Sequence, residues 1–211
     1  YSFGGYYRNL GRETFLIPVI WPHDHEGPLL SPDSGKVELS YPFPRLETVR
    51  IEDSPVDFSE QAIKLKWNSA FKDDRNHVQR LSDTSIVLTL QHNLKASFFG
   101  TRQTSWSVDQ KMTFHLDALA SNDWIGFVSY IKPTTFFGVK CIKENSYKAV
   151  FYEIIDGVET VFDAYQIKEN VTIRLIAEAQ DYSYLISTLD GEKQFTFDGR
   201  NISCDLNDAH T

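Results

Sequence analysis

The sequence predicts an all-β protein built around one antiparallel β-sandwich. Aromatic residues make up 14% of the 211 residues, with 15 Phe, 10 Tyr and 4 Trp, and such residues favour strands over helices. Short segments of alternating apolar and polar residues recur at intervals of roughly ten residues, without helical patterns between them. That spacing is typical of a sandwich, in which hairpins join neighbouring strands.

The first part of the chain differs from the rest in its proline content. Six of the eight prolines lie before residue 45, and proline fixes φ and removes a backbone donor. Residues 14–21 form the one segment here that reads as a strand, and residues 22–56 read as a linker. We therefore predict an N-terminal segment over 1–21, a linker over 22–56 and a sandwich domain over 57–211.

Repeated short strands begin after residue 57. The alternation of apolar and polar residues in Ile63 to Trp67 predicts a half-buried strand. The dipeptides Asp156-Gly157 and Asp190-Gly191 predict tight hairpin turns. The expected strands cover residues 63–67, 85–90, 106–116, 124–131, 136–142, 147–155, 158–165, 171–177, 182–189 and 192–197.

Charge and hydropathy exclude two classes of partner. The net charge is −8, from 21 basic and 29 acidic residues, which argues against a nucleic-acid surface. No apolar run approaches the roughly 18 to 20 residues that a bilayer span requires. We expect neither nucleic acid nor a membrane as a partner.

The start of the sequence and its cysteines bear on the protein's compartment. The chain begins at Tyr1 without an initiator Met or a signal-like stretch, so we expect it to begin inside a longer protein. Cys141 and Cys204 either pair in an oxidising compartment or remain two thiols, and both interpretations stay open. Sequons at Asn170 and Asn201 favour a secreted, glycosylated protein over a cytoplasmic one.

Two motifs carry a resemblance to a known family. The run Leu-Gly-Arg-Glu-Thr-Phe-Leu at 10–16 and the Arg-Gln-Thr triplet at 102–104 resemble family 43 glycoside hydrolases. Segments 35–37, 125–130 and the Asp-Gly-Arg loop at 198–200 agree in order. In that family of β-xylosidases and α-L-arabinofuranosidases, a five-bladed catalytic propeller precedes a concanavalin A-like jelly-roll sandwich. The resemblance implies that 1–21 is the last propeller-blade segment and that the sandwich lacks its final strands.

The resemblance also implies where the catalytic groups lie. Family members invert the anomeric centre with a general-base Asp, a general-acid Glu and a second Asp that tunes the acid, with carboxyl groups roughly 6.5 to 9.5 Å apart. All three precede the motif at 10–16, so this chain is expected to hold no catalytic residue. Arg12 is the expected substrate-binding residue of the intact enzyme, or alternatively a partner of Glu13 in a salt bridge. The Glu26-Gly27-Pro28 triplet resembles the family's acid motif but reads as a turn.

Metal sites have weak support in the sequence, and no cofactor is expected. The polar run at 23–26 places ligands one and two residues apart, and such ligands do not converge on one ion. A calcium site on the sandwich stays open because carboxylates are available, although no spacing singles them out. These carboxylates are Asp57, Asp83, Asp109 and Asp117.

Aromatic residues are the other candidates for binding. Most should lie in the core, but consecutive strand residues point to opposite faces, so one member of each aromatic pair faces outward. An outward ring would contact a propeller or stack on a sugar ring. The candidates are Phe98, Phe99, Trp106, Trp124, Phe136 and Phe137.

Three functions follow from these observations. The first is an accessory sandwich that docks on a catalytic β-propeller, in the same polypeptide or a companion chain, and supports hydrolysis of pentose-containing oligosaccharides from xylan or arabinan. The second is a carbohydrate-binding module that acts alone. The third is a stand-alone concanavalin A-like protein with a regulatory role. The motif at 10–16 favours the first, because it is typical of the end of a propeller blade.

Overall fold

The computed structural model describes Asn9 and residues 17–23, 27–38, 57–69, 77–89 and 97–207. These residues belong to two compact units. One contains Asn9 and residues 98–207, and the other contains the remaining described residues up to residue 97. Each unit is described by itself.

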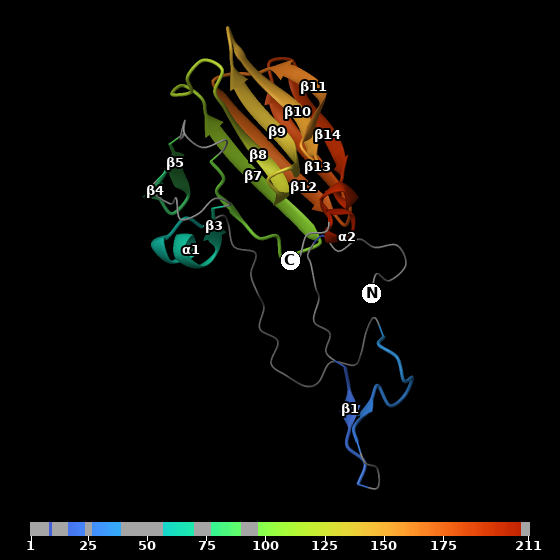
Figure 1. Cartoon of the computed structure of the whole chain (residues 1–211). Helices are drawn as coiled ribbons and strands as arrows, with labels where there is room; N and C mark the ends of the chain where they lie inside the picture. Colours follow the sequence, from blue (N-terminus) through green and yellow to red (C-terminus); the bar gives the residue numbers. More distant parts are fainter. Residues whose placement is uncertain are drawn as a thin grey trace. The chain divides into compact units, whose positions relative to one another are not determined.

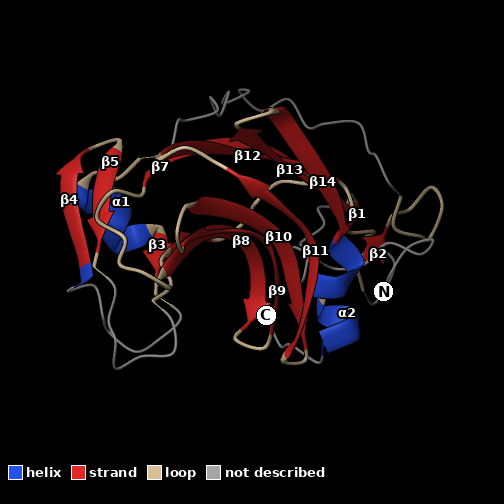
Figure 2. Cartoon of the chain, turned by 90° about the horizontal axis from the view of Figure 1, so that it is seen from above, coloured by secondary structure: helices blue, strands red, loops and turns tan. Residues whose placement is uncertain are grey.

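The first unit is an antiparallel β-sandwich of two four-stranded sheets, as predicted (Figures 1 and 2). One sheet has the order β11-β10-β9-β8 and the other β14-β13-β12-β7. The strands are β7 (Ser107–His115), β8 (Trp124–Lys132), β9 (Thr135–Lys143), β10 (Tyr147–Ile155), β11 (Val158–Gln166), β12 (Asn170–Glu178), β13 (Asp181–Thr188) and β14 (Gly191–Asp198).

Most strands follow their sequence neighbours through hairpins, with one long return. After β7 the chain builds the whole of the β8–β11 sheet before β12 returns beside β7, where Val171 lies opposite Phe114. The hairpin between β10 and β11 turns at Asp156 and Gly157, whose φ angles are 49° and 86°. Two successive positive φ values match the twist of a tight hairpin. Between β13 and β14 the turn is formed by Leu189 and Asp190, and Gly191, at φ 106°, is the first residue of β14. Both predicted hairpins are confirmed, the second with its turn one residue earlier than predicted.

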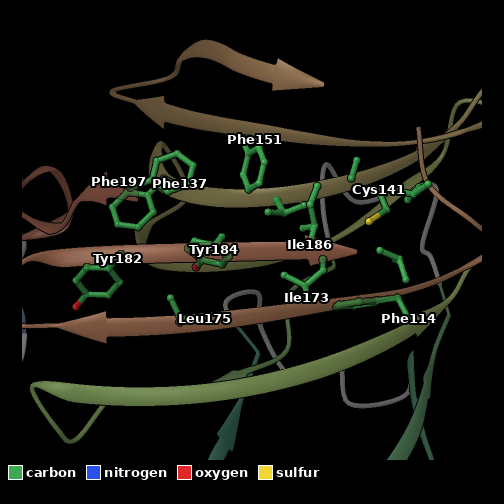
Figure 3. Packing of buried hydrophobic residues seen from close by; sticks show 14 of the residues in the cluster. Phe114, Phe137, Cys141, Phe151, Ile173, Leu175, Tyr182, Tyr184, Ile186 and Phe197 are labelled. Carbon is green, nitrogen blue, oxygen red and sulfur yellow. The ribbon is translucent and has the colours of Figure 1, made fainter. Parts of the chain in front are cut away.

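Aromatic rings fill the space between the two sheets (Figure 3). Phe137 of β9 stacks on Phe197 of β14 with ring centroids 4.8 Å apart and planes 4° apart. Phe137 also meets the edge of Tyr182 at 5.5 Å, and all three side chains are buried. Burial of one such ring contributes about 1.5 to 3 kcal/mol, so this cluster is a main source of the sandwich's stability.

Two polar groups in the core, the Tyr184 hydroxyl and the Cys141 thiol, are accommodated in different ways. The Tyr184 and Ser129 hydroxyls share a hydrogen bond of 2.7 Å across the two sheets. Cys141 is fully buried in β9, whereas Cys204 is half-buried, and no disulfide joins them. Burial raises the pKa of the Cys141 thiol to about 12, so this side chain behaves as a small apolar residue.

Two glycines let β8 and β9 approach closely. A Cβ built on Gly126 would lie 2.5 Å from the Val139 carbonyl oxygen. At Gly138, where φ is 155°, a Cβ would collide with the Phe127 carbonyl oxygen and lie 2.8 Å from Val128 Cα. No other residue type fits at either position without separating the strands.

Short elements complete the first unit and make up the second. In the first unit these are β6 (Gly100–Thr101), the 3₁₀ turn η2 (Gly199–Ile202) and α2 (Cys204–Asn207). The second unit contains the hairpin of β1 (Val19–Ile20) and β2 (Leu29–Leu30), the helix α1 (Glu60–Leu65), β3 (Trp67–Asn68), and the hairpin of β4 (Val78–Ser82) and β5 (Ser85–Leu88). Among the described residues, no helix is long and apolar enough to cross a membrane.

The strand predicted over residues 63–67 is wrong, because most of that segment lies in α1. The Ser59 hydroxyl caps the helix by accepting a hydrogen bond of 3.2 Å from the Ala62 amide. Glu60 in the first turn and Lys64 in the last turn complement the helix dipole. The cap and the charged end residues favour a helix. Five alternating residues are too few to distinguish the period of 2 of a strand from the period of 3.6 of a helix.

Two further details differ from the sequence prediction. Within residues 14–21, the described strand is limited to Val19–Ile20, which pairs with Leu29–Leu30 inside the predicted linker. The strand Val78–Ser82 was not anticipated, since its exposed Gln79 and Arg80 obscure the pattern. The domain boundaries at 21 and 56 stay predictions.

Replacing Gly138 with Ala should destabilise the sandwich by about 2 to 4 kcal/mol, because the added carbon forces β8 and β9 apart. Urea denaturation followed by tryptophan fluorescence measures this loss. Gly27→Ala is the control, since a Cβ at Gly27 meets nothing within 4 Å. Equal stability of the two variants would contradict the close approach.

The cysteines should differ in their reaction with a disulfide reagent at pH 8. Cys141 should stay unreactive until denaturant is added, since its raised pKa keeps the thiol protonated below about pH 12 and the core excludes the reagent. Cys204 should react in the folded chain. Colorimetric titration counts the thiols, and two fast equivalents, or none even after unfolding, would refute this assignment.

Candidate functional site

A continuous row of aromatic side chains lines the face of the β8–β11 sheet that points away from the core. Trp124 meets the edge of Tyr152 at 6.3 Å, and Tyr152 meets Phe136 at 5.9 Å. The ring centroids of Phe136 and Tyr130 are 6.0 Å apart, and those of Tyr130 and Phe98 are 4.5 Å apart. We call these five residues the aromatic row. The sheet that carries most of it lies on the concave side of the sandwich (Figure 2).

Strand alternation and register assemble this row. Phe137 points into the core, so its neighbour Phe136 must point outward. Tyr130 of β8 and Ile154 of β10 lie directly opposite Phe136. Tyr152 lies opposite Gly138, which has no side chain of its own. The glycine therefore leaves room on this face for the large ring of its cross-strand neighbour.

Tyr152 lies between Trp124 and Phe136 in the row and is almost fully buried. Its side chain is 1% exposed, and its hydroxyl has no hydrogen-bond partner among the described residues. The Lys140 ammonium lies 4.4 Å from the ring centroid and pairs with Glu159 at 2.7 Å. Burial, with a smaller effect from the Glu159 charge, raises the pKa of Tyr152 well above its usual range, so its hydroxyl stays a neutral donor.

The row reaches solvent at Trp124, which is 40% exposed. The Lys140–Glu159 pair adds charge beside the rings, and Lys132 pairs with Asp156 at 2.8 Å nearer the hairpin end of the sheet. Large rings bordered by a few charged groups suit an apolar partner surface or the C–H face of a sugar ring. This face can bind a partner, and its described side chains include no set for nucleophilic catalysis.

The opposite outer face, on the β7–β12–β13–β14 sheet, is polar. Arg174 of β12 makes two hydrogen bonds to Asp109 of β7, at 2.8 and 2.5 Å. The hydroxyls of Thr113 and Thr172 lie 3.0 Å apart on the same pair of strands. These side chains already bind one another across neighbouring strands, so this face offers few apolar contacts to a partner.

The predicted aromatic candidates fall in two places. Phe98, Trp124 and Phe136 belong to the row, whereas Phe137 is buried in the core. Phe99 and Trp106 are half-buried. The sequence analysis missed Tyr130 and Tyr152. In the strand register, Tyr130 lies opposite Phe136 and Tyr152 lies opposite Gly138, so both side chains point to the same face as Phe136. Arg12, the predicted substrate-binding residue, lies outside the described residues, as do Asp24 to Glu26 of the polar run.

The carboxylates considered for calcium do not converge in the structure. Among the described residues, no group of three or more potential ligands comes together. Asp57 accepts a bond of 2.7 Å from the Ser59 amide, Asp83 pairs with Arg80, and Asp109 pairs with Arg174. Each of these three carboxylates serves its own local structure.

The Arg-Gln-Thr triplet has a structural role at its central residue. Gln103 accepts a hydrogen bond of 2.9 Å from the Tyr182 hydroxyl, and its amide donates to the Ser105 carbonyl at 2.8 Å. Tyr182 belongs to the core, where burial raises its pKa. Gln103 therefore ties the segment before β7 to the interior of the sandwich.

The two sequons have different surroundings. Asn170 is exposed, and its side-chain oxygen lies 2.7 Å from His115 Nδ1. Asn201 donates to Glu153 at 3.3 Å, and Ser203, the third residue of its sequon, is fully buried. Glycosylation at either position stays a prediction.

Comparison with known proteins identifies a relative. No family profile matches the chain. A non-reducing end α-L-arabinofuranosidase of Bacteroides ovatus, BoGH43B, is 33% identical over 135 residues, which is 59% of this chain and 25% of that enzyme. Part of the chain is therefore related in sequence to one family 43 arabinofuranosidase. It matches about a quarter of the curated relative's length.

Several solved glycosidase structures share the fold of the chain. The chain superposes on the structure titled Bacteroides ovatus Xyloglucan PUL GH43B with a TM-score of 0.76 and 22% identity, covering 97% of this chain and 43% of that one. Bacillus licheniformis BlXynB gives 0.79 and 18%, covering 95% and 41%. A xylan β-1,4-xylosidase of Bacillus halodurans gives 0.73 and 16%, covering 97% and 42%. At these identities the likeness establishes the fold alone.

Removing the Tyr152 hydroxyl should leave the stability of the chain unchanged or raise it slightly, because this buried hydroxyl has no hydrogen-bond partner among the described residues. Tyr152→Phe should differ from the parent by under about 0.5 kcal/mol in urea denaturation. Tyr184→Phe, which breaks the bond to Ser129, should lose about 1 kcal/mol as the matched control. A larger loss in Tyr152→Phe would show that this hydroxyl bonds within the chain.

Proposed function

We propose that this chain is the accessory β-sandwich of a family 43-type glycosidase that hydrolyses pentose-containing oligosaccharides with inversion. In this proposal the catalytic carboxylates lie in another part of the enzyme, and the sandwich supports the active site without performing catalysis itself. Arg12 would bind substrate in the intact enzyme.

The observation that carries the proposal is the combination of relatedness and coverage. The chain is 33% identical to part of an arabinofuranosidase, and it aligns over nearly all its own length with only about two fifths of each solved family 43 chain. The matched enzymes therefore contain a large region that this chain does not cover. A sandwich related to part of each such enzyme fits an accessory role.

The aromatic row supplies a surface for docking on that other region. It is the apolar outer face of the sandwich, whereas the opposite face is covered by hydrogen-bonded polar side chains. Interfaces within an enzyme are enriched in Tyr, Trp and Phe at their centres. We propose that Trp124, Tyr130 and Phe136 pack against the catalytic propeller.

A second function, sugar binding by the sandwich alone, has one observation in its favour. The aromatic row ends at Trp124, whose side chain is 40% exposed. The C–H face of a sugar ring can stack on such an exposed ring. Calorimetric titration of the 211-residue chain with xylobiose separates this function from docking.

The accessory role predicts that the 211-residue chain alone hydrolyses neither 4-nitrophenyl β-D-xyloside nor the α-L-arabinofuranoside, whereas the full-length gene product cleaves at least one. Release of 4-nitrophenol measures both activities.

Trp124→Ala in the full-length protein should lower its melting temperature by several degrees through a lost interdomain contact. In the isolated chain the same change should cost little, since Trp124 is already partly exposed.

Hydrolysis by the isolated chain would overturn the accessory role. Leu81→Ala is the control for the Trp124 variant, because Leu81 is an exposed apolar residue, at 60%, that lies outside the aromatic row. Equal effects of the two changes on the full-length protein would argue against docking through the row.

A further inference from the structure

The hairpin of β1 and β2, in the second unit, has paired strands but exposed side chains. Val19 lies opposite Leu30, and Ile20 lies opposite Leu29. All four strand side chains are large and apolar, yet each is 42 to 56% exposed, and Trp21, directly after β1, is 72% exposed. We call these five residues the apolar hairpin.

Both faces of this hairpin are apolar. Successive strand residues point to opposite faces, so the Val19–Leu30 pair lies on one face and the Ile20–Leu29 pair on the other. A two-stranded hairpin is at best marginally stable in water by itself. Single exposed apolar residues are normal on a protein surface, whereas a contiguous group of them marks a contact surface. The apolar hairpin is such a group.

Three prolines restrict how a partner can bind this hairpin. Pro18 and Pro22 lie on either side of β1, and Pro28 directly precedes β2, so the backbone has no amide donor at these positions. The Pro18 carbonyl already accepts a hydrogen bond of 2.9 Å from the Ser31 amide. An added strand therefore finds few backbone groups to pair with, and a partner would contact the side chains instead.

The composition of the apolar hairpin favours a protein surface over a sugar as the partner. Four of its five side chains are the aliphatic groups of Val, Ile and Leu, and Trp21 is its single aromatic ring. Sugars stack on flat aromatic rings. The fully buried centre of a protein–protein contact, in contrast, is more apolar than the rest of the surface and accepts aliphatic side chains.

We propose that the apolar hairpin packs against the catalytic region of the enzyme, so that the second unit has its own contact with that region. This inference rests on the proposed function. The alignments with solved structures cover 95 to 97% of this chain but only 41 to 43% of those chains. More than half of each such chain therefore lies outside the alignment and supplies a surface that can cover the hairpin. The aromatic row and the apolar hairpin are then two separate contacts with one partner.

Hydroxyl-radical footprinting with mass spectrometry tests whether the hairpin is covered. Labelling of Trp21 and Leu30 should fall about tenfold in the full-length gene product relative to the 211-residue chain, because a packed contact excludes water. Leu65 of α1 and Leu81 of β4 are the controls, since both are exposed apolar residues of the same unit outside the hairpin. Their labelling should stay the same. Equal labelling of Trp21 in the two proteins, or an equal fall at both control leucines, would overturn the proposal.

A matched pair of variants tests whether the contact stabilises the full-length protein. Ile20→Thr keeps a β-branched side chain in β1 but makes it polar, and Leu81→Thr places the same residue on the exposed strand β4. In the full-length protein Ile20→Thr should lower the melting temperature by roughly 2 to 4 °C, and Leu81→Thr by under about 1 °C. In the 211-residue chain both changes should be small, since both side chains are already exposed. Equal shifts of the two variants in the full-length protein would contradict the contact.

The same measurements distinguish the other outcomes. Labelling of Trp21 that falls as the concentration of the 211-residue chain is raised would assign the hairpin to a second copy and overturn the proposal. If the full-length protein cleaves neither pentoside, the proposed function is wrong, and the labelling of Trp21 still decides whether the rest of the polypeptide covers the hairpin. If the full-length protein is active but Trp21 keeps its labelling, the accessory function stands and the inference from the apolar hairpin is wrong.

Discussion

The packing of Phe137 against Phe197, with Tyr182 and Tyr184 at their edges, holds the two sheets together. Because strand residues alternate between faces, placing Phe137 in this cluster forces Phe136 to the outer face. The core contact therefore also places Phe136, the middle residue of the aromatic row, on the outer face. Any variant that shifted the register of β9 by one residue would move both rings to the wrong side.

Glycine has an equally direct effect on the outer face. Gly126 and Gly138 allow β8 and β9 to approach so closely that an added methyl group would meet backbone atoms of the neighbouring strand. Opposite Gly138, the absence of a side chain leaves space that the Tyr152 ring can cover. Backbone proximity and side-chain packing are thus linked, and the Tyr152 ring is buried although it belongs to an outer face.

Tyr182 and Tyr184 show how one strand serves two purposes. Both rings point into the core from β13, but their hydroxyls reach different partners. Tyr184 bonds to Ser129 of the facing sheet, which joins the two layers. Tyr182 bonds to Gln103, which joins the core to the segment before β7. The same type of buried phenol joins the two sheets in one place and holds the segment before β7 in the other.

The amino-acid sequence alone determined the antiparallel sandwich, most of its strands from 106 to 197, and the hairpins at Asp156-Gly157 and Asp190-Gly191, because alternation and turn chemistry are local properties. Alternation also predicted that one ring of the Phe136–Phe137 pair faces outward. It failed at residues 63–67, where a serine cap and charged end residues favour a helix. Only the tertiary structure decided which ring faces outward, that Tyr130 and Tyr152 join it, and that Gln103 bonds to Tyr182. These contacts depend on strand register and on residues up to 79 positions apart, and no local pattern in a single sequence records such distances.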